Sequence, residues 1–195
     1  MPKGEWEQNP AHLVLDRAGL WPFKDGEIKS VLDVACGLSL KSKFLAPSVI
    51  VGVDIYKPYL EAIESDVPYS VVKYDIRRIR DIFIDNSFDV VYALDIIEHL
   101  YEDESKSLME QCKCIAKKAV VIETPKGYIP QDIDIQGYGA HEYQTHRSGW
   151  SVKELENLGF KCTVRPYRMK DIKRHTHLKI DPNVEVITGI YLKEQ

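Results

Sequence analysis

One stretch decides the fold: Ser30-Val31-Leu32-Asp33-Val34-Ala35-Cys36-Gly37-Leu38-Ser39. Its apolar residues are typical of a parallel strand that is covered on both faces. Gly37 then lets the backbone turn close to a bound ligand, and Ala35 and Ser39 are small enough to keep the same space open. About twenty residues later, Asp54 ends a second apolar run, where a ribose-binding carboxylate is expected. The stretch therefore predicts the first strand and turn of a nucleotide-type cofactor site.

Length and composition predict one ordinary globular domain. The chain has 195 residues, of which 44% are hydrophobic and 29% charged. Its net charge of -4 argues against a general nucleic-acid binder, which would usually be basic. No apolar run approaches the roughly 20 residues that span a bilayer, and the N-terminus has no apolar signal core. We therefore expect a cytoplasmic protein without a membrane segment. The four cysteines fit no zinc or redox motif.

Strands and helices alternate along the chain. Beyond the opening stretch, strands are expected at 49–54, 69–73, 87–93, 119–123, 160–164 and 184–192, and helices at 11–18, 38–45, 58–65, 77–83 (a short helix or turn), 102–116 and 151–158. This alternation predicts an α/β fold with a single doubly wound, mostly parallel seven-stranded sheet and helices on both faces. No clear helix separates the last two strands, so the last strand is expected to be antiparallel. Residues 1–195 are expected to form a single domain, which begins with a helical segment at 1–29.

An aspartate stands at the end of each of the first four predicted strands. These residues are Asp33, Asp54, Asp75 and Asp95. The carboxyl ends of parallel strands form the ligand-binding edge of such a sheet, so the four carboxylates are expected to meet there. A pocket rich in carboxylates does not suit a pyrophosphate. It suits a ligand that carries hydroxyls, amines and a positive centre.

The same stretches carry a family resemblance. In this order and spacing, they resemble the cofactor motifs of class I S-adenosylmethionine-dependent methyltransferases, at residues 31–39, 51–55, 74–76 and 88–100. The resemblance extends from Ser30 to Leu192, and that family also has an antiparallel seventh strand. It implies an enzyme that takes a methyl group from S-adenosylmethionine and releases S-adenosylhomocysteine.

The resemblance implies a set of cofactor contacts. The methionine part would contact Asp33, Ala35, Cys36, Gly37 and Ser39, with Asp33 near the amino group. Asp54 would accept both ribose hydroxyls. The adenine would contact Ile55, Ile76 and, at its exocyclic amine, Asp75, and the sulfonium end would be flanked by Leu94 and Asp95. Ala35 and Ser39 depart from the family's pattern, because they stand where its first and third glycines are usual.

Three histidines are candidates for a general base. Methyl transfer depends mainly on the alignment of acceptor and methyl group, but a hydroxyl acceptor also benefits from a base. His99 follows the fourth strand. His141 and His146 lie within residues 124–150, which show no clear period and form the expected acceptor-side loop. For each of the three, a histidine with a structural role is the simpler alternative.

Metal binding is not expected. Asp95, Glu98 and His99 resemble the acidic-acidic-histidine cluster of quinone-biosynthesis O-methyltransferases, with which a divalent cation has been associated. Glu98 and His99 are adjacent in the sequence, however, and adjacent residues do not share one face of a helix. We therefore expect no metal ligands in this chain.

The acceptor is expected to be a small molecule that is methylated at oxygen or nitrogen. No Asn/Asp-Pro-Pro-aromatic motif follows the fourth strand, which argues against transfer to a base amine of nucleic acid. The basic run 165–177 is either a solvated loop or a guide for an anionic acceptor. A catalytically silent scaffold or sensor subunit is the alternative, because Ser39 and the short helix before Pro47 are unusual. A nicotinamide dehydrogenase does not fit, since the first turn lacks the glycines that a pyrophosphate needs.

Overall fold

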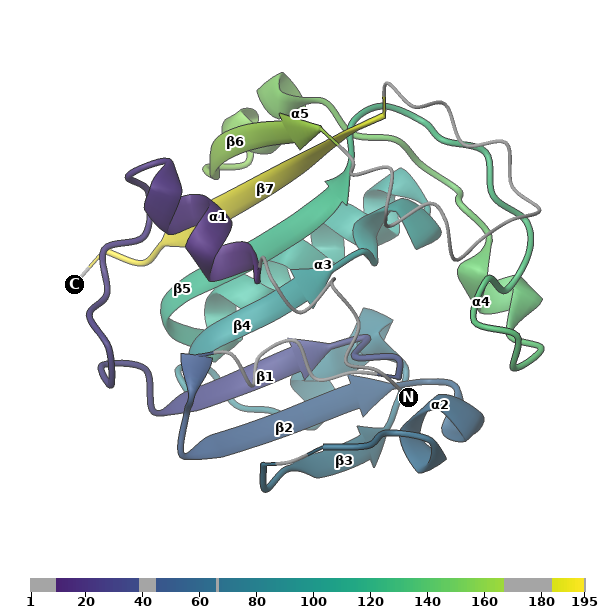
Figure 1. The fold of residues 1–195 in the computed structure, drawn as a ribbon, viewed down its shortest axis with the longest axis horizontal. Helices are drawn as coiled ribbons and strands as arrows, with labels where there is room; N and C mark the ends of the chain where they lie inside the picture. The colour runs from purple at the N-terminus through teal and green to yellow at the C-terminus, as the bar shows by residue number, and fades with distance from the viewer. Residues whose placement is uncertain (1–9, 39–44, 66, 167–183, 195) are drawn as a thin grey trace.

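The computed structural model describes residues 10–38, 45–65, 67–166 and 184–194 (Figure 1). Its seven-stranded sheet has the order β3-β2-β1-β4-β5-β7-β6. The strands are β1 Ser30–Val34, β2 Val49–Asp54, β3 Ser70–Lys73, β4 Phe88–Leu94, β5 Ala116–Pro125, β6 Lys161–Pro166 and β7 Glu185–Leu192. Strands β1 to β5 pair in parallel, and β7 is antiparallel to both β5 and β6. The predicted fold class is therefore confirmed.

Helices cover both faces of the sheet. On one face, α3 (Glu102–Ile115) packs residues such as Leu108 into the larger core cluster, which also contains Leu32 of β1. On the other face, α1 (Ala11–Arg17) packs over a second cluster that contains Val31. Figure 1 shows α1 in front of the sheet and α3 behind it. Neighbouring residues of β1 thus serve opposite faces, as the two-residue period of a strand requires.

Some local elements differ from those expected. Helix α2 spans only Lys57–Glu61 and is therefore shorter than the expected helix, since residues 63–65 are not helical. The next helix is a 3-10 helix, η3 (Ile76–Asp81). The helix expected at 38–45 lies almost entirely outside the described residues, as does most of the basic run.

The connection between β5 and α5 (Val152–Asn157) leaves the sheet and returns to it. Isolated bridges pair Trp150 with Lys126 and Gly127, so the two ends of the connection lie together. Helix α4 (His141–Gln144) lies between these ends, beyond the carboxyl ends of the parallel strands (Figure 1). Among the described residues, no helix is long and apolar enough to cross a membrane.

Candidate functional site

The turn after β1 has a left-handed backbone. The φ angles of Ala35 and Gly37 are 54° and 56°. This region costs a residue with a Cβ atom about 1–2 kcal/mol, which explains why glycine is the expected residue at the position of Ala35. Between them, Cys36 donates its N–H to the carbonyl of Val53 at 3.0 Å. The strained turn is therefore held against β2.

Asp54 strengthens this connection from the end of β2. Its buried carboxylate accepts one hydrogen bond from the N–H of Gly37 (2.9 Å) and another from the N–H of Tyr56 (2.8 Å), at different oxygens. Burial raises the pKa of Asp54, and the backbone donors oppose that increase. A carboxylate has about four acceptor positions, so the group can accept further hydrogen bonds from a ligand.

The other three aspartates have different surroundings. Asp33 is buried inside β1 and lies beside Tyr92 of β4, not at the strand end as expected, because the strand runs one residue further. Asp75 caps η3, and both of its oxygens accept hydrogen bonds from the Arg77 guanidinium, which lowers the pKa of Asp75. Asp95 is exposed and directly follows β4, with a φ of 53°.

A 3-10 turn after β4, η4 (Ile97–His99), is bound to the connection that follows β5. The N–H of Arg147 donates to the carbonyl of Glu98 at 2.7 Å, and Nη1 of Arg147 donates to the carbonyl of His99 at 2.7 Å. These bonds bring His146 beside His99. The two imidazole centroids are 4.6 Å apart, with 77° between the ring planes.

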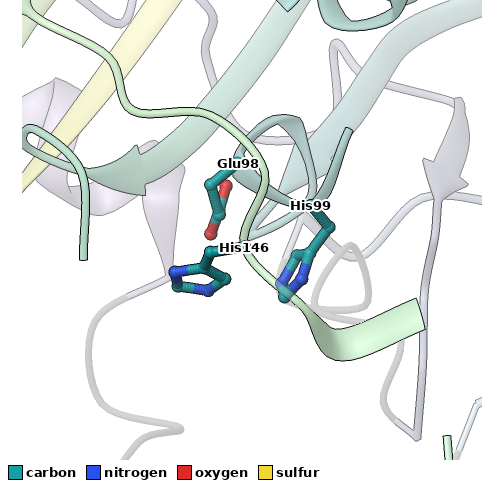
Figure 2. Close-up of side chains that lie close together, drawn as sticks. All are labelled: Glu98, His99 and His146. Atoms are coloured by element: carbon teal, nitrogen blue, oxygen red, sulfur yellow. The ribbon is translucent and has the colours of Figure 1, made fainter. Parts of the chain in front are cut away.

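Glu98 completes a buried cluster with the two histidines (Figure 2). Its Oε2 accepts a hydrogen bond from Oγ1 of Thr124 at 2.9 Å. A carboxylate oxygen of Glu98 and one ring nitrogen each of His99 and His146 lie within 4.8 Å of one another. Glu98 and His99, which were not expected to share one face of a helix, nevertheless both reach this cluster. They stand in a single 3-10 turn instead of an α-helix, and His146 approaches both of them from the loop.

Hydrogen bonds and burial determine the protonation of these rings. Nδ1 of His146 lies 2.6 Å from the carbonyl of Ile129, so it donates a proton there and Nε2 keeps its lone pair. Nδ1 of His99 is buried and has no hydrogen-bond partner among the described residues. Burial lowers the pKa of His99 to about 4, with a further contribution from His146, and burial also lowers the pKa of His146. Both rings are therefore neutral at pH 7.

Known proteins resemble this chain in sequence and in fold. Residues 32–122 match the family described as a methyltransferase domain. The structure is similar to a SAM-dependent methyltransferase from Archaeoglobus fulgidus over 97% of each chain, with 20% identity and a TM-score of 0.56. A SAM-dependent methyltransferase from Mesorhizobium loti is similar over 94% of this chain and 99% of that chain, with 14% identity and a TM-score of 0.59. No curated protein sequence matches the chain.

A third similar structure is the magnesium protoporphyrin IX methyltransferase of Synechocystis PCC 6803 with bound SAH. It aligns over 94% of this chain and 83% of that chain, with 15% identity and a TM-score of 0.56. At these identities the structures show the fold, and the match over residues 32–122 adds the family. Residues 32–122 are a methyltransferase domain, and the chain has the fold of the class I S-adenosylmethionine-dependent enzymes. The methyl donor of this class is S-adenosylmethionine.

The remaining predicted cofactor residues of the methyltransferase are mostly buried. Ile55 is half-buried just after β2, whereas Ile76 and Leu94 belong to the core clusters on opposite faces of the sheet. Cys36 is buried, which raises the pKa of its thiol, so the thiol is protonated at pH 7. Ser39 lies outside the described residues.

His141 of the methyltransferase does not belong to the histidine cluster. It is the exposed first residue of α4, and its Nδ1 accepts a hydrogen bond from the N–H of Asp134 at 3.0 Å. In the neutral ring the proton is therefore on Nε2, and no lone pair is left for an incoming proton. Of the three candidate bases, the structure joins His99 and His146 only.

Nothing in the sequence pattern indicated an aromatic contact on the ribose side of the methyltransferase. Tyr56, which follows β2, contacts the ring of Tyr143 at 5.8 Å, and Tyr59 contacts Tyr138 at 5.7 Å between centroids. The hydroxyl of Tyr59 also donates to Asp134 at 2.6 Å, and Asp134 accepts three backbone N–H groups of its own loop. The acceptor-side loop is thus joined to the segment beside Asp54. Both segments contain tyrosines, but their spacing in the sequence does not show that they pair.

Proposed function

We propose that the methyltransferase moves a methyl group from S-adenosylmethionine to an oxygen or nitrogen atom of a small-molecule acceptor. One observation carries this proposal: two buried, neutral histidines, His99 after β4 and His146 in the connection after β5, meet near Asp95. Asp95 is near enough to raise the pKa of both rings against the effect of burial. The resemblance assigns the sulfonium end to this position. A hydroxyl acceptor loses a proton during transfer, and a neutral imidazole nitrogen accepts it.

The proposed cofactor site is centred on Asp54, whose remaining acceptor positions suit the ribose hydroxyls. The methionine part is assigned to Asp33, Ala35, Cys36, Gly37 and Ser39, the adenine to Ile55, Asp75 and Ile76, and the sulfonium end to Leu94 and Asp95. We expect Asp75 to contribute less than Asp54 to cofactor binding, because the Arg77 guanidinium already donates hydrogen bonds to both oxygens of Asp75.

His146 is the preferred base among the three histidine candidates. The Ile129 carbonyl holds its Nδ1 proton, so Nε2 presents a lone pair in a fixed orientation. His99 is the second candidate, since its Nδ1 has no hydrogen-bond partner among the described residues. His141 is the third, because the N–H of Asp134 already occupies its lone pair.

A small acceptor is supported by one similar structure, which is named for its action on magnesium protoporphyrin IX. A catalytically silent S-adenosylmethionine-binding scaffold is the competing candidate. The histidine pair favours an active enzyme, because a scaffold needs no lone pairs at this position. We also propose a cytoplasmic location, which suits the four free thiols of Cys36, Cys112, Cys114 and Cys162.

Calorimetry with S-adenosylhomocysteine, followed by turnover of labelled S-adenosylmethionine on a panel of phenols, alcohols and amines, tests the proposal. We expect binding that Asp54→Ala weakens by at least about tenfold. We expect His146→Gln to lower kcat for hydroxyl acceptors by about 100-fold and to leave cofactor affinity unchanged. Exposed Lys153→Gln, on α5, is the control. Binding without transfer to any acceptor would favour the scaffold, and absence of binding would overturn both candidates.

A further inference from the structure

The cluster of Glu98, His99 and His146 has the donor set of a metal site. Imidazole nitrogen and carboxylate oxygen are ligands of Zn²⁺ and neighbouring transition metals, whereas Mg²⁺ and Ca²⁺ prefer oxygen donors alone. Adjacent ligand atoms of a tetrahedral zinc site are about 3.3 Å apart for bonds of about 2.0–2.1 Å. The three atoms here lie within 4.8 Å of one another, so modest side-chain rotation would close the site. We propose that this cluster binds a divalent transition-metal cation, with Zn²⁺ the best match.

His99 provides an independent reason for a ligand at this place. Its side chain is 6% exposed, and its Nδ1 has no hydrogen-bond partner among the described residues. A buried polar atom without a partner costs about 1–3 kcal/mol, and a cation bound by this nitrogen would remove that cost. The ring is directed toward His146 and therefore toward the other two ligand atoms (Figure 2).

The cluster is also held from outside, as the ligands of metal sites usually are. The Ile129 carbonyl accepts the Nδ1 proton of His146 and thereby leaves Nε2 for the cation. The hydroxyl of Thr124 fixes one oxygen of Glu98. The N–H of Arg147 donates to the carbonyl of Glu98, so the two ligand-bearing segments are joined through their backbones. A cation would meet ligands that are already oriented.

Three protein ligands leave at least one coordination position for water or for another molecule. Within the proposed function, an acceptor hydroxyl would occupy this position, and the cation would lower its pKa and replace imidazole as the means of deprotonation. That consequence rests on the proposed function. The cation site itself does not.

Metal titration of the tag-free protein, after treatment with a chelator and dialysis, tests the site. Zn²⁺ binding is measured by calorimetry, and Co²⁺ binding by the visible absorption of low-coordinate cobalt. We expect one equivalent with a Kd of about 1 μM or below, which corresponds to about 8 kcal/mol. Glu98→Gln, His99→Gln and His146→Gln should each weaken binding by at least about 100-fold. His141→Gln, an exposed histidine on the same loop, should retain the wild-type metal affinity.

Circular dichroism and S-adenosylhomocysteine calorimetry on each variant separate loss of a ligand from loss of the fold. If a histidine variant does not fold, the near-isosteric Glu98→Gln decides. No metal binding to the wild type, or equal binding to wild type and folded cluster variants, would overturn the site. Metal binding by a wild type that does not bind S-adenosylhomocysteine would support the cation site and refute the proposed function, so the two failures are distinguishable.

Discussion

Asp54 serves the backbone and, in our proposal, the cofactor with one carboxylate. Its hydrogen bonds to the N–H groups of Gly37 and Tyr56 join the turn after β1 to the segment after β2. The same oxygens face the ligand edge with acceptor positions to spare. Replacing this side chain therefore removes a ligand contact and loosens the turn that the ligand would lie against.

As the pH is lowered, cofactor affinity should begin to fall at a higher pH than it would if Asp54 had the pKa of an exposed aspartate. Burial raises the pKa of Asp54, so the carboxylate is ionised above that raised value and becomes protonated as the pH falls through it. Protonation removes the charged acceptor of the ribose hydroxyls. Calorimetry with S-adenosylhomocysteine between pH 7 and pH 4 measures this loss. Asp54→Asn should bind about tenfold more weakly at pH 7 and show no pH dependence. Equal pH profiles for the two proteins would contradict the assignment.

Asp75→Asn should affect the cofactor much less. Arg77 already donates to both oxygens of Asp75, and this ion pair is partly exposed. We expect the Kd for S-adenosylhomocysteine to rise by less than about fivefold, a change of about 1 kcal/mol, and the free energy of unfolding to fall by less than about 1 kcal/mol. Calorimetry and urea unfolding measure the two quantities. A loss as large as that of Asp54→Asn would instead indicate direct contact with the adenine amine.

At the level of residues, it was easier to predict which side chains lie near the strand ends than to predict which side chains contact one another. The aspartates at the end of β2 and after β3 and β4 follow from the rule that ligands lie at strand ends. Asp33 was expected at the end of β1 but lies one residue before it, because Val34 also belongs to the strand. The meeting of His99 and His146 could not be predicted, since it depends on hydrogen bonds between backbone groups that are distant in the sequence.

At the level of elements, Asp134 organises the acceptor-side loop. It accepts hydrogen bonds from the Tyr59 hydroxyl and from three backbone N–H groups of the loop. We expect Asp134→Ala to increase amide hydrogen exchange over residues 134–145 by about tenfold or more, because each lost buried bond costs about 1–3 kcal/mol. Mass spectrometry measures the exchange. Exposed Asp132→Ala is the matched control, and equal exchange in both variants would refute this role.

Gly149 fixes the return of the loop to the sheet. A Cβ atom at this position would lie 2.4 Å from the backbone nitrogen of Tyr128, so the two chain segments would have to separate. We expect Gly149→Ala to cost about 2–3 kcal/mol and to lower Tm by about 4–12 °C. Gly137→Ala, which has a φ of 80° but no close neighbour, should cost only about 1–2 kcal/mol. Thermal unfolding of both variants separates the cost of crowding at Gly149 from the cost of backbone strain at Gly137. Equal losses of stability would contradict the crowding at Gly149.

Most elements could be predicted from local pattern, and the acceptor-side loop could not. The run 102–116 and the capping box of Ser151 and Glu154 produced helices close to those expected, because periodicity and end signals agree there. The loop has little regular structure of its own. Its shape comes from Asp134, from the aromatic contacts and from the bridges to Trp150, which are all tertiary interactions.

For the molecule as a whole, the order of the strands in the sheet determines where a ligand site is expected. The chain moves from β1 outward through β2 to β3 and then crosses to β4 and β5 on the other side of β1. The carboxyl ends of β1 and β4 are therefore the point where the direction of winding reverses, and ligands of open α/β sheets bind at such points. Asp54 and the histidine cluster follow strands on opposite sides of this point. The fold class alone was enough to predict this general location.

The position of β7 has a consequence for how the protein is made. Strand β7 follows β6 in the chain but lies between β5 and β6 in the sheet. During translation, β6 leaves the ribosome before the strand that it pairs with exists, and β5 keeps an open edge in the meantime. Open strand edges are templates for aggregation. Until β7 emerges, the nascent chain therefore exposes the edges of β5 and β6 that β7 covers in the folded protein.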